Sequence, residues 1–437
     1  MGDVIIDGLT GANRLVILDA NGKIPALDGS LVTAIAGANF SSGTIPVARI
    51  DTGTAAGKVV KLDGNAKLPA VSGAALTGIV GATQSASDPT LSSNPSGGVG
   101  TEWQNTTSGE VYICTDATAG ENVWKNVGEG SGNITPWQFG GTTYGYGLGG
   151  NPAPQNDVID KYSYASDANA TDVGNMLYGA QGCMGNKGTS YGYVAGGEPS
   201  KTDINKFSYS SDGNATDVGD LTIGRAFWHG AGASSGTYIY WMGGEGGGQS
   251  YRNVIDKNSV STDANATDVG DLVVGTRNAR GNSSATYGYC MGGDLSGTPE
   301  SDVIQRWAFA SDGNAVDTTA NLLTTNYMFA GNASSTTHGY VAGGIDGTGP
   351  SNRTNKIQKH QFDTSNNATD VGDLTGGPNS GANSGGGGSS STTYGYRHGG
   401  WPSYRDEIEK WAFASDGNGI DVGNLSVGRE DMGGTQA

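Results

Sequence analysis

The chain has 437 residues, of which 77 are glycine and only 15% are charged, and its formal net charge is −18. A chain this acidic is poorly suited to bind a nucleic-acid backbone or an anionic membrane surface through its charge. When glycine is counted as apolar, the composition approaches the globular average, so thin cores of Tyr, Trp and small aliphatic residues can form.

The N-terminus, Met1 to Ile5, has neither the basic start nor the apolar stretch of a signal peptide, and no apolar run approaches the roughly 18 residues that span a bilayer. Three cysteines, Cys114, Cys183 and Cys290, lie far apart and match neither a disulfide framework nor a zinc spacing. We therefore expect buried free thiols, no membrane insertion and synthesis in a cytosol.

Residues 1–82 contain a faint repeat, in which Leu18 to Ala26 (Leu-Asp-Ala-Asn-Gly-Lys-Ile-Pro-Ala) recurs as Leu62 to Ala70. Apolar residues lead to an Asp-x-Asn turn and then to a Lys-apolar-Pro edge. Such short strands, separated by Ala and Gly, cannot enclose a core alone. We expect an intertwined β-rich stalk, formed by a homotrimer; a disordered leader is the alternative.

Residues 83–132 change in character. Ser85 to Gly100 is typical of a loop. It is followed by three short antiparallel strands whose inward faces we expect to carry Trp103, Val111, Ile113 and Trp124. The hairpin turn is expected at residues 107–110 and a glycine-rich joint at residues 128–132. A module of this size is marginal alone and should depend on its neighbours.

Residues 133–437 contain six copies of one unit, each opening with a short aromatic strand that ends in Gly-Gly. A period near 50 residues indicates one supersecondary unit copied and stacked. The copies of the aromatic strand are Tyr144–Gly150, Tyr191–Gly197, Tyr238–Gly244, Tyr287–Gly293, His338–Gly344 and Tyr394–Gly400.

After a variable loop, each unit continues with a second strand of fixed pattern: Ile, any residue, a cation, then usually two aromatic residues two apart. Alternation places the aromatic pair on one face and Ile with the cation on the other, so both faces must be covered by neighbouring sheets. These strands begin at Ile159, Ile204, Ile255, Ile304, Ile357 and Ile408.

A turn rich in Asp, Asn and Gly, a third strand and a linking segment complete four strands per unit. Six four-stranded units predict a six-bladed kelch-like β-propeller in an all-β chain. We expect the C-terminal segment Gly428–Gly434 to pair beside Tyr144–Gly150 and close the ring. Pro136–Phe139 competes for that position, and the sequence does not decide between them.

The units resemble kelch-like repeats in virion proteins of tailed bacteriophages, especially those of aquatic hosts. The motif is Tyr-Gly-Tyr-x-x-Gly-Gly followed by an aromatic strand and Ser-Asp-Gly-Asn-Ala-Thr-Asp-Val-Gly-Asp-Leu, and it stands nearly whole in Tyr191–Gly197 and Phe207–Leu221. Trp103–Val127 resembles a small module of tail-associated proteins, and the first repeat resembles tail-fibre shaft sequence. The resemblance implies an N-terminal part docked to other tail proteins, a homotrimer and a distal domain facing the host.

The recurrent turn offers a candidate cation site. Asp212, Asn214 and Asp217 have the Asp-x-Asn-x-x-Asp spacing of oxygen ligands that suits Ca²⁺. The alternative is a plain β-turn, in which Asp and Asn bond their own backbone, and we prefer it because one turn supplies few acidic ligands. The cation of the second strand could neutralise one such Asp within the same unit.

The loops after each Gly-Gly differ between units and should emerge on one face of the ring. Aromatic faces and the forked donors of Arg suit polysaccharide or protein surfaces. Packing over neighbouring blades is the alternative role for these side chains. The candidate receptor-contact residues are Tyr251, Arg252, Arg353, Trp401, Tyr404 and Arg405.

Catalysis has little support, since the chain has four scattered histidines and lacks the common zinc-protease, nucleophile-elbow and phosphate-loop motifs. We therefore expect no enzyme, no catalytic residue and no resident cofactor. The first hypothesis is a phage tail fibre, assembled in the host cytoplasm and located in the virion, whose propeller binds the host surface during adsorption. The second is a purely structural virion protein whose propeller contacts other viral proteins, and a carbohydrate-active enzyme is a remote third.

Overall fold

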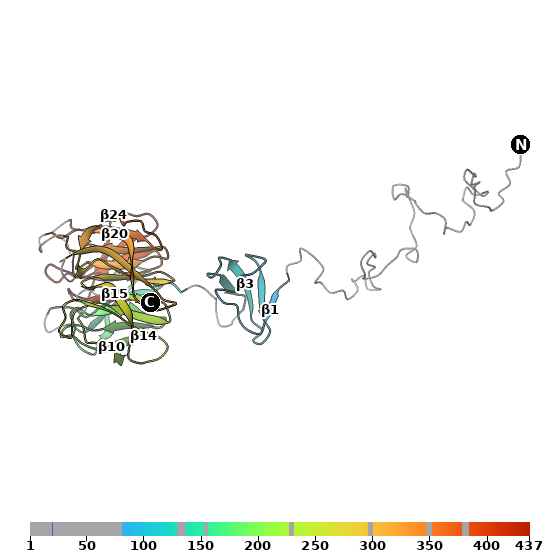
Figure 1. Cartoon of the computed structure of the whole chain (residues 1–437), viewed down its shortest axis with the longest axis horizontal. Helices are drawn as coiled ribbons and strands as arrows, with labels where there is room; N and C mark the ends of the chain where they lie inside the picture. Colours follow the sequence, from blue (N-terminus) through green and yellow to red (C-terminus); the bar gives the residue numbers. More distant parts are fainter. Residues whose placement is uncertain are drawn as a thin grey trace, which may run out of the picture. The chain divides into compact units, whose positions relative to one another are not determined.

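In the computed structural model of the chain, the described residues are 20, 81–128, 137–152, 156–226, 231–295, 300–346, 352–377 and 384–437. Their regular structure is entirely β-strand, as predicted, and none of them belongs to a helix that could cross a membrane (Figure 1). Apart from residues 20, 81 and 82, the predicted stalk lies outside the described residues.

A small sheet forms first along the described chain. Its strands run in the order β1 (Thr83–Ser85), β2 (Glu102–Asn105), β3 (Val111–Asp116) and β4 (Val123–Asn126). The pairs β2–β3 and β3–β4 are antiparallel, as expected, whereas β1 adds a parallel edge strand that the sequence did not indicate.

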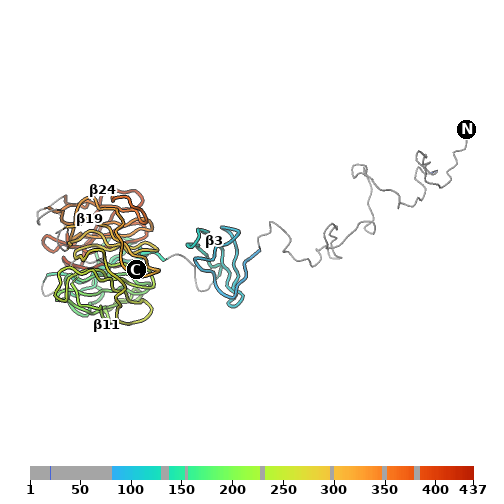
Figure 2. The backbone as a smooth tube through the Cα atoms, in the orientation of Figure 1, coloured from blue at the N-terminus to red at the C-terminus, as the bar shows by residue number. Residues whose placement is uncertain are grey.

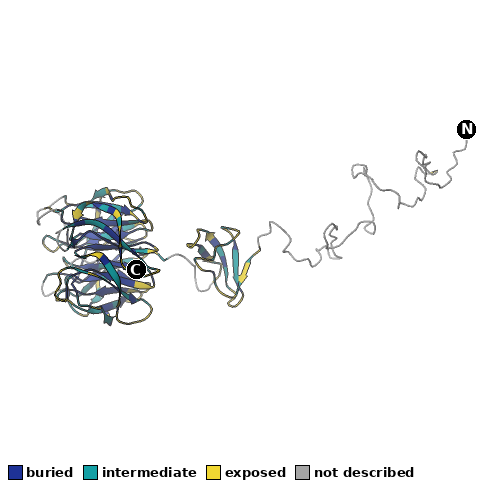
Figure 3. Ribbon diagram, viewed as in Figure 1, coloured by how far each residue is buried: buried dark blue, intermediate teal, exposed yellow. Residues whose placement is uncertain are grey.

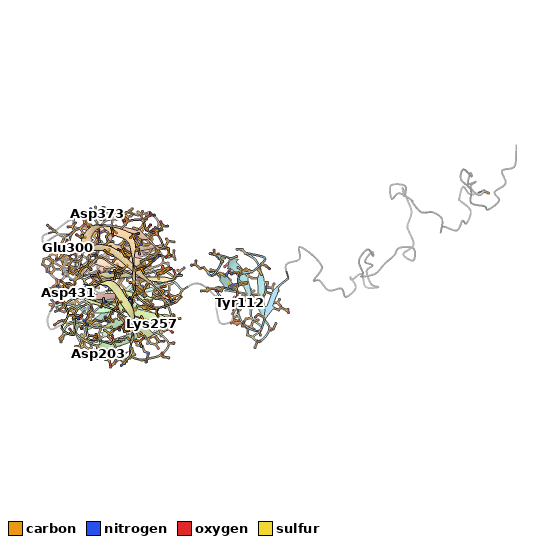
Figure 4. The ribbon with its side chains drawn as sticks, viewed as in Figure 1. Tyr112, Asp203, Lys257, Glu300, Asp373 and Asp431 are labelled. Carbon is orange, nitrogen blue, oxygen red and sulfur yellow. The ribbon has the colours of Figure 1, made fainter. Side chains whose placement is uncertain are left out.

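The inward face of this sheet was predicted only in part. Trp103 and Trp124 pack edge to face with ring centroids 5.7 Å apart, as expected. On β3, however, the residues with no exposed surface are Tyr112 (labelled in Figure 4) and Cys114, not Val111 and Ile113. Both faces of β3 carry apolar residues, so alternation alone gave no preference.

Six further antiparallel sheets follow between Tyr144 and Gln436, and we call them units 1 to 6. In each unit an inner strand pairs with the aromatic strand, which pairs with the Ile strand, which pairs with an outer strand. In that order the strands are β29 (Gly433–Gln436), β5 (Tyr144–Leu148), β6 (Val158–Ser163) and β7 (Thr171–Asn175) in unit 1; β8 (Met184–Lys187), β9 (Tyr191–Ala195), β10 (Asp203–Ser208) and β11 (Thr216–Asp220) in unit 2; β12 (Ala231–Ser234), β13 (Tyr238–Met242), β14 (Arg252–Ser259) and β15 (Thr267–Arg277) in unit 3; β16 (Arg280–Ser283), β17 (Tyr287–Met291), β19 (Ser301–Ala308) and β20 (Val316–Asn326) in unit 4; β21 (Gly331–Ser334), β22 (His338–Ala342), β23 (Lys356–Gln361) and β24 (Thr369–Asp373) in unit 5; β25 (Gly387–Ser390), β26 (Tyr394–His398), β27 (Glu407–Ala412) and β28 (Ile420–Asn424) in unit 6. β18 (Asp294–Leu295) also pairs with β15.

Each unit is covered on both faces by its neighbours, which gives a propeller-like arrangement. The apolar clusters between neighbouring units are buried (Figure 3). In five of the six contacts between units, the second Tyr of the aromatic strand stacks on the second aromatic residue after the next unit's Ile; the exception is Tyr193, whose counterpart in unit 3 is Val260. Tyr146 stacks on Tyr209 with centroids 5.5 Å apart, and Tyr340 stacks on Phe413 at 4.9 Å. Tyr396 of unit 6 stacks on Tyr164 of unit 1 at 4.7 Å, so the last unit packs against the first.

The glycine of Tyr-Gly-Tyr is required by the aromatic residue paired with it across the strands. A Cβ on Gly145 would lie 2.4 Å from the ring of Tyr162, its partner in register. In unit 3 the glycine is replaced by Ile239, and there the opposite residue is Asn258 rather than an aromatic residue. The two positions therefore change together to keep the packing volume constant.

The inner strands approach one another so closely that the second residue is glycine in five of the six; in β21 it is Asn332. A Cβ on Gly281 would lie 2.1 Å from the carbonyl oxygen of Gly232, and one on Gly434 would lie 2.3 Å from that of Gly388. Near the last residues of the strands, serine hydroxyls link neighbouring units: the Ser283 Oγ accepts the Ser234 N–H at 3.0 Å. The axis is thus filled largely by backbone.

The C-terminal segment closes unit 1, as expected. β29 pairs with β5 in the register Gly433–Leu148 to Gln436–Gly145, and the backbone trace of Figure 2 ends within the repeat domain. The strand begins only near the end of the predicted segment Gly428–Gly434. Asp431 has a φ of 55°, so the chain before β29 is not extended. The competing segment Pro136–Phe139 forms no strand in its described residues 137–139.

Two ion pairs join unit 6 and the C-terminal segment to unit 1, and they differ in burial. The side chains of Arg429 and Asp160 are completely buried, and Arg429 also donates to the carbonyls of Gly149 and Val158, both at 3.0 Å. Lys410 and Asp167 are 2.5 Å apart, but the Asp167 side chain is 54% exposed.

We predict that Arg429→Met lowers the free energy of unfolding by about 3–5 kcal/mol, because Asp160 would remain buried without its cation. Lys410→Met, the matched exposed control, should cost less than about 1 kcal/mol. Denaturant titrations of the two variants measure the difference. If both variants lost the same free energy of unfolding, the buried Arg429–Asp160 pair would not be the main polar contact that holds the C-terminal segment to unit 1.

Candidate functional site

The recurrent Asp-Asn turn, our candidate cation site, joins each unit to the one before it. Asp212 forms an ion pair with Lys161 at 2.8 Å, and the Asn214 Oδ1 accepts the Asn175 N–H at 3.0 Å. Asp217 accepts the N–H of Gly219 at 3.1 Å within its own turn. The three side chains have three separate partners, which is the arrangement of a structural turn rather than of convergent cation ligands.

The cation of the Ile strand does neutralise an Asp, but the prediction of a pair within one unit is wrong. Each cation pairs with an Asp of the next unit, because the turn of that unit lies over the strand. In five units the paired Asp lies two residues before the turn Asn. In unit 5 that position is Ser365, and the partner is Asp363 instead. The six pairs are Lys161–Asp212, Lys206–Asp263, Lys257–Asp312 (Lys257 is labelled in Figure 4), Arg306–Asp363, Lys359–Asp416 and Lys410–Asp167.

The Asn of the turn recurs for the same reason. In every unit its side-chain oxygen accepts a backbone N–H from the outer strand of the preceding unit, at 3.0 or 3.1 Å. The turn residues that recur are thereby engaged between units. They build the scaffold and leave recognition to other residues.

A buried acceptor after the Ile was missed by the sequence analysis, which treated that position as free. It is Asp, Asn, Gln or Glu in every unit, and it accepts a backbone N–H from the preceding unit: Gln305 accepts that of Val273 at 2.7 Å. Where it is Asp or Glu, a buried Arg pairs with it: Arg225 with Asp256, Arg397 with Glu409 and Arg429 with Asp160. The sequence did contain a signal for this role, because the residue after the Ile is Asp, Asn, Gln or Glu in all six units.

The loops after Gly-Gly bring two of the candidate receptor residues together. The Arg353 guanidinium of unit 5 lies 4.2 Å from the ring centroid of Trp401 in unit 6. Trp401 is fixed by its own backbone, since its N–H donates to the carbonyl of Ser384 at 2.7 Å. Burial lowers the pKa of Arg353. This stack is a contact between units and also part of the loop surface, because both side chains are only partly buried.

Tyr404 is the candidate with the most exposed side chain. It is 43% exposed, and it follows Trp401 in the same loop. Its φ is 49°, in the left-handed region, so the loop turns sharply there. Beside it, the Arg405 Nη1 donates to the Glu407 Oε1 at 3.1 Å, and Arg405 Nε donates to the Pro402 carbonyl at 3.2 Å. We call Arg353, Trp401, Tyr404 and Arg405 the loop cluster.

Tyr251 and Arg252 belong to a different part of the domain, in unit 3. Arg252 donates through Nε and Nη2 to the carbonyl of Gly246, at 2.9 and 2.7 Å, which holds its own loop. The Tyr251 ring lies 5.3 Å from the guanidinium of Arg277, a residue that also forms ion pairs with Glu245 and Asp294. The six candidates thus form two groups on different units.

The histidines that the structure describes do not form a reactive group. His360 takes the aromatic position of the Ile strand and His398 ends β26, and both are buried. Burial lowers the pKa of His360 to about 4 and that of His398 to about 3, so both are neutral at pH 7. His338 occupies a position that is Tyr in the other aromatic strands, and burial lowers its pKa too.

No family model and no curated protein matches the chain. Among solved structures, the one described as "Structure of YjhT" is similar to this chain with 13% sequence identity and a TM-score of 0.46, over 57% of this chain and 86% of that one. A similarity at this level says nothing about ligand or reaction.

We predict that Arg353 and Trp401 stabilise each other. Arg353→Met and Trp401→Leu should each destabilise the protein, and the double variant should lose about 0.5–1 kcal/mol less than the sum, since the cation–π contact is lost only once. A double-mutant cycle from urea unfolding measures this coupling. Additive losses would show that the stack contributes nothing beyond packing.

Proposed function

We propose that the chain is a tail-fibre-like virion protein of a tailed bacteriophage and that its repeat domain, a six-bladed kelch-like propeller, binds the host cell surface. Residues 1–82 would form a trimeric stalk docked to other tail proteins. The phage-like repeat motif and the shaft-like N-terminal repeat support this proposal, and so does the sharp division between recurrent and variable residues.

One observation carries the assignment of the binding face. The recurrent polar residues are engaged between units, whereas Tyr404 offers an exposed ring in a loop that is unique to unit 6. Next to it lie the Arg353–Trp401 stack and Arg405, whose guanidinium is positioned by Glu407. Aromatic faces and oriented Arg donors together suit a polysaccharide or a protein loop.

The test of this face compares two exposed tyrosines. Tyr404→Asn removes the ring while keeping a residue that tolerates left-handed φ, and we expect at least a tenfold loss of binding to host cells, as for an aromatic hot spot. Tyr238→Asn is the control, because Tyr238 is 39% exposed but lies at the start of β13, at the strand end away from the Gly-Gly loops.

Host-cell binding and a glycan array with the purified full chain measure the two variants. Equal binding by both would remove the loop cluster from the proposed site. A wild-type protein that binds no host cell and no glycan would instead favour the purely structural role in the virion.

The stalk has its own test. If residues 1–82 form an intertwined trimer, the full chain should elute with three times the mass of one chain in light scattering. Deletion of residues 1–82 should convert it to a monomer. A monomeric full chain would contradict the trimeric stalk and would leave the proposal for the loop cluster untouched.

A further inference from the structure

The inner strands enclose a cavity on the axis of the repeat domain. It has a volume of about 20 Å³ and is lined by residues of all six inner strands, β8, β12, β16, β21, β25 and β29, together with Phe139 and Cys183. A space of this size is sufficient for one water molecule or for a single-atom ion little larger than water.

Two cationic side chains line this cavity, and the structure shows no carboxylate in its lining. Lys187 is the last residue of β8, and Arg280 is the first residue of β16. Because the inner strands occupy equivalent positions in their units, first and last residues lie toward opposite ends of the axis. Lys187 and Arg280 therefore approach the cavity from its two ends.

Both cations are buried, with exposed fractions of 8% for Lys187 and 4% for Arg280. The Lys187 Nζ donates to the carbonyls of Gly140 at 2.8 Å and Gln138 at 3.3 Å. The Arg280 Nη2 donates to the carbonyls of Phe329, at 2.8 Å, and Gly386. These partners are neutral, so neither positive charge is compensated by them.

The other buried arginines show what is unusual here. Arg225, Arg397 and Arg429 each form an ion pair with a buried carboxylate. Among the described residues, Arg280 forms no such ion pair. Its Nε is buried without an acceptor, but so is the Nε of the three paired arginines, and only the missing carboxylate distinguishes Arg280. Asp431 attracts Arg280 through space but is not part of the cavity lining. A buried guanidinium that is not paired with a carboxylate is costly, in a chain with 42 acidic residues available elsewhere.

Burial lowers the pKa of Lys187 to about 8 and that of Arg280 to about 9. Both groups remain predominantly protonated at pH 7. The positive charge around the axis also acts on His398, whose pKa is lowered first by its burial and then by nearby arginines that include Arg280. Two buried cations with neutral hydrogen-bond partners therefore border one small cavity.

We propose that the axial cavity binds a small inorganic anion of the halide class, with chloride as the natural occupant, between Arg280 and Lys187. The anion supplies the missing counter-charge and an acceptor for the Arg280 Nε. It links the inner strands of several units at the axis, where the cavity lining contains no carboxylate.

The ion should be tested during refolding, so that it is present while the inner strands assemble around the cavity. Full-length protein is refolded from denaturant in sodium chloride, bromide or gluconate at one ionic strength. We expect Tm in either halide to exceed that in gluconate, by roughly 4 °C at a halide concentration 100 times Kd. The difference should increase with the logarithm of the halide concentration.

Variants separate this site from general salt effects. Lys187→Met and Arg280→Met should abolish the Tm difference between halide and gluconate, whereas Lys206→Met, which removes an outer ion pair, should retain it. If Arg280→Met does not fold, Lys187→Met decides this comparison.

A crystal of the wild type grown in bromide gives an independent measurement. An anomalous bromine peak on the axis, within hydrogen-bond distance of the Arg280 Nε, is the expected result. A water molecule with no anomalous signal, or an equal Tm in halide and gluconate, would overturn the proposal.

Discussion

The structure of the repeat domain depends on one constraint: every sheet is apolar on both faces. Ile159 packs in a cluster with residues of unit 2, such as Phe207, while Tyr162 on the opposite side of the same strand packs with Tyr396 of unit 6. A sheet with two apolar faces cannot be stable alone in water, since burial of apolar area is the main favourable contribution to folding. The units must therefore be stacked, and the last must meet the first.

Polar contacts fix how the units are stacked. The turn Asn, the cation of the Ile strand and the buried acceptor after Ile each reach into an adjacent unit, so one repeat supplies groups that only its neighbour can satisfy. Buried polar atoms without partners are costly, and this requirement specifies the register between units more sharply than apolar packing can. The same engagement explains why the recurrent residues are poor candidates for recognition and why the variable loops are better ones.

The repeated pattern made much of the fold predictable. The aromatic strands and the Ile strands follow from the sequence, because a pattern copied six times averages out the ambiguity of each copy. The C-terminal segment was the expected source of the closing strand, but only the structure decided between it and Pro136–Phe139. The ion pair between the cation of the Ile strand and an Asp of the turn was also predicted from the sequence. Its assignment to one unit was wrong, because identical copies make the partner in the same unit and the partner in the next unit indistinguishable in sequence.

For the candidate site, the sequence identified the loops that differ but not which of their side chains meet. Trp401 and Arg353 are neighbours because units 5 and 6 are adjacent, whereas Tyr251 and Arg252 are held within unit 3. The same limit applies at the axis, where Arg280 and Lys187 come from strands nearly 100 residues apart in the chain and line one cavity.

By itself, the sequence determined the repeating unit, its all-β character and the covered faces of its strands, since these depend on local alternation and on volume exchanges such as Ile239 with Asn258. Only the tertiary structure decided which unit satisfies each polar group, which loops share a surface and which charges are left facing each other at the axis. These relations depend on how copies are placed around a common axis, and that placement is a property of the closed assembly rather than of any one repeat.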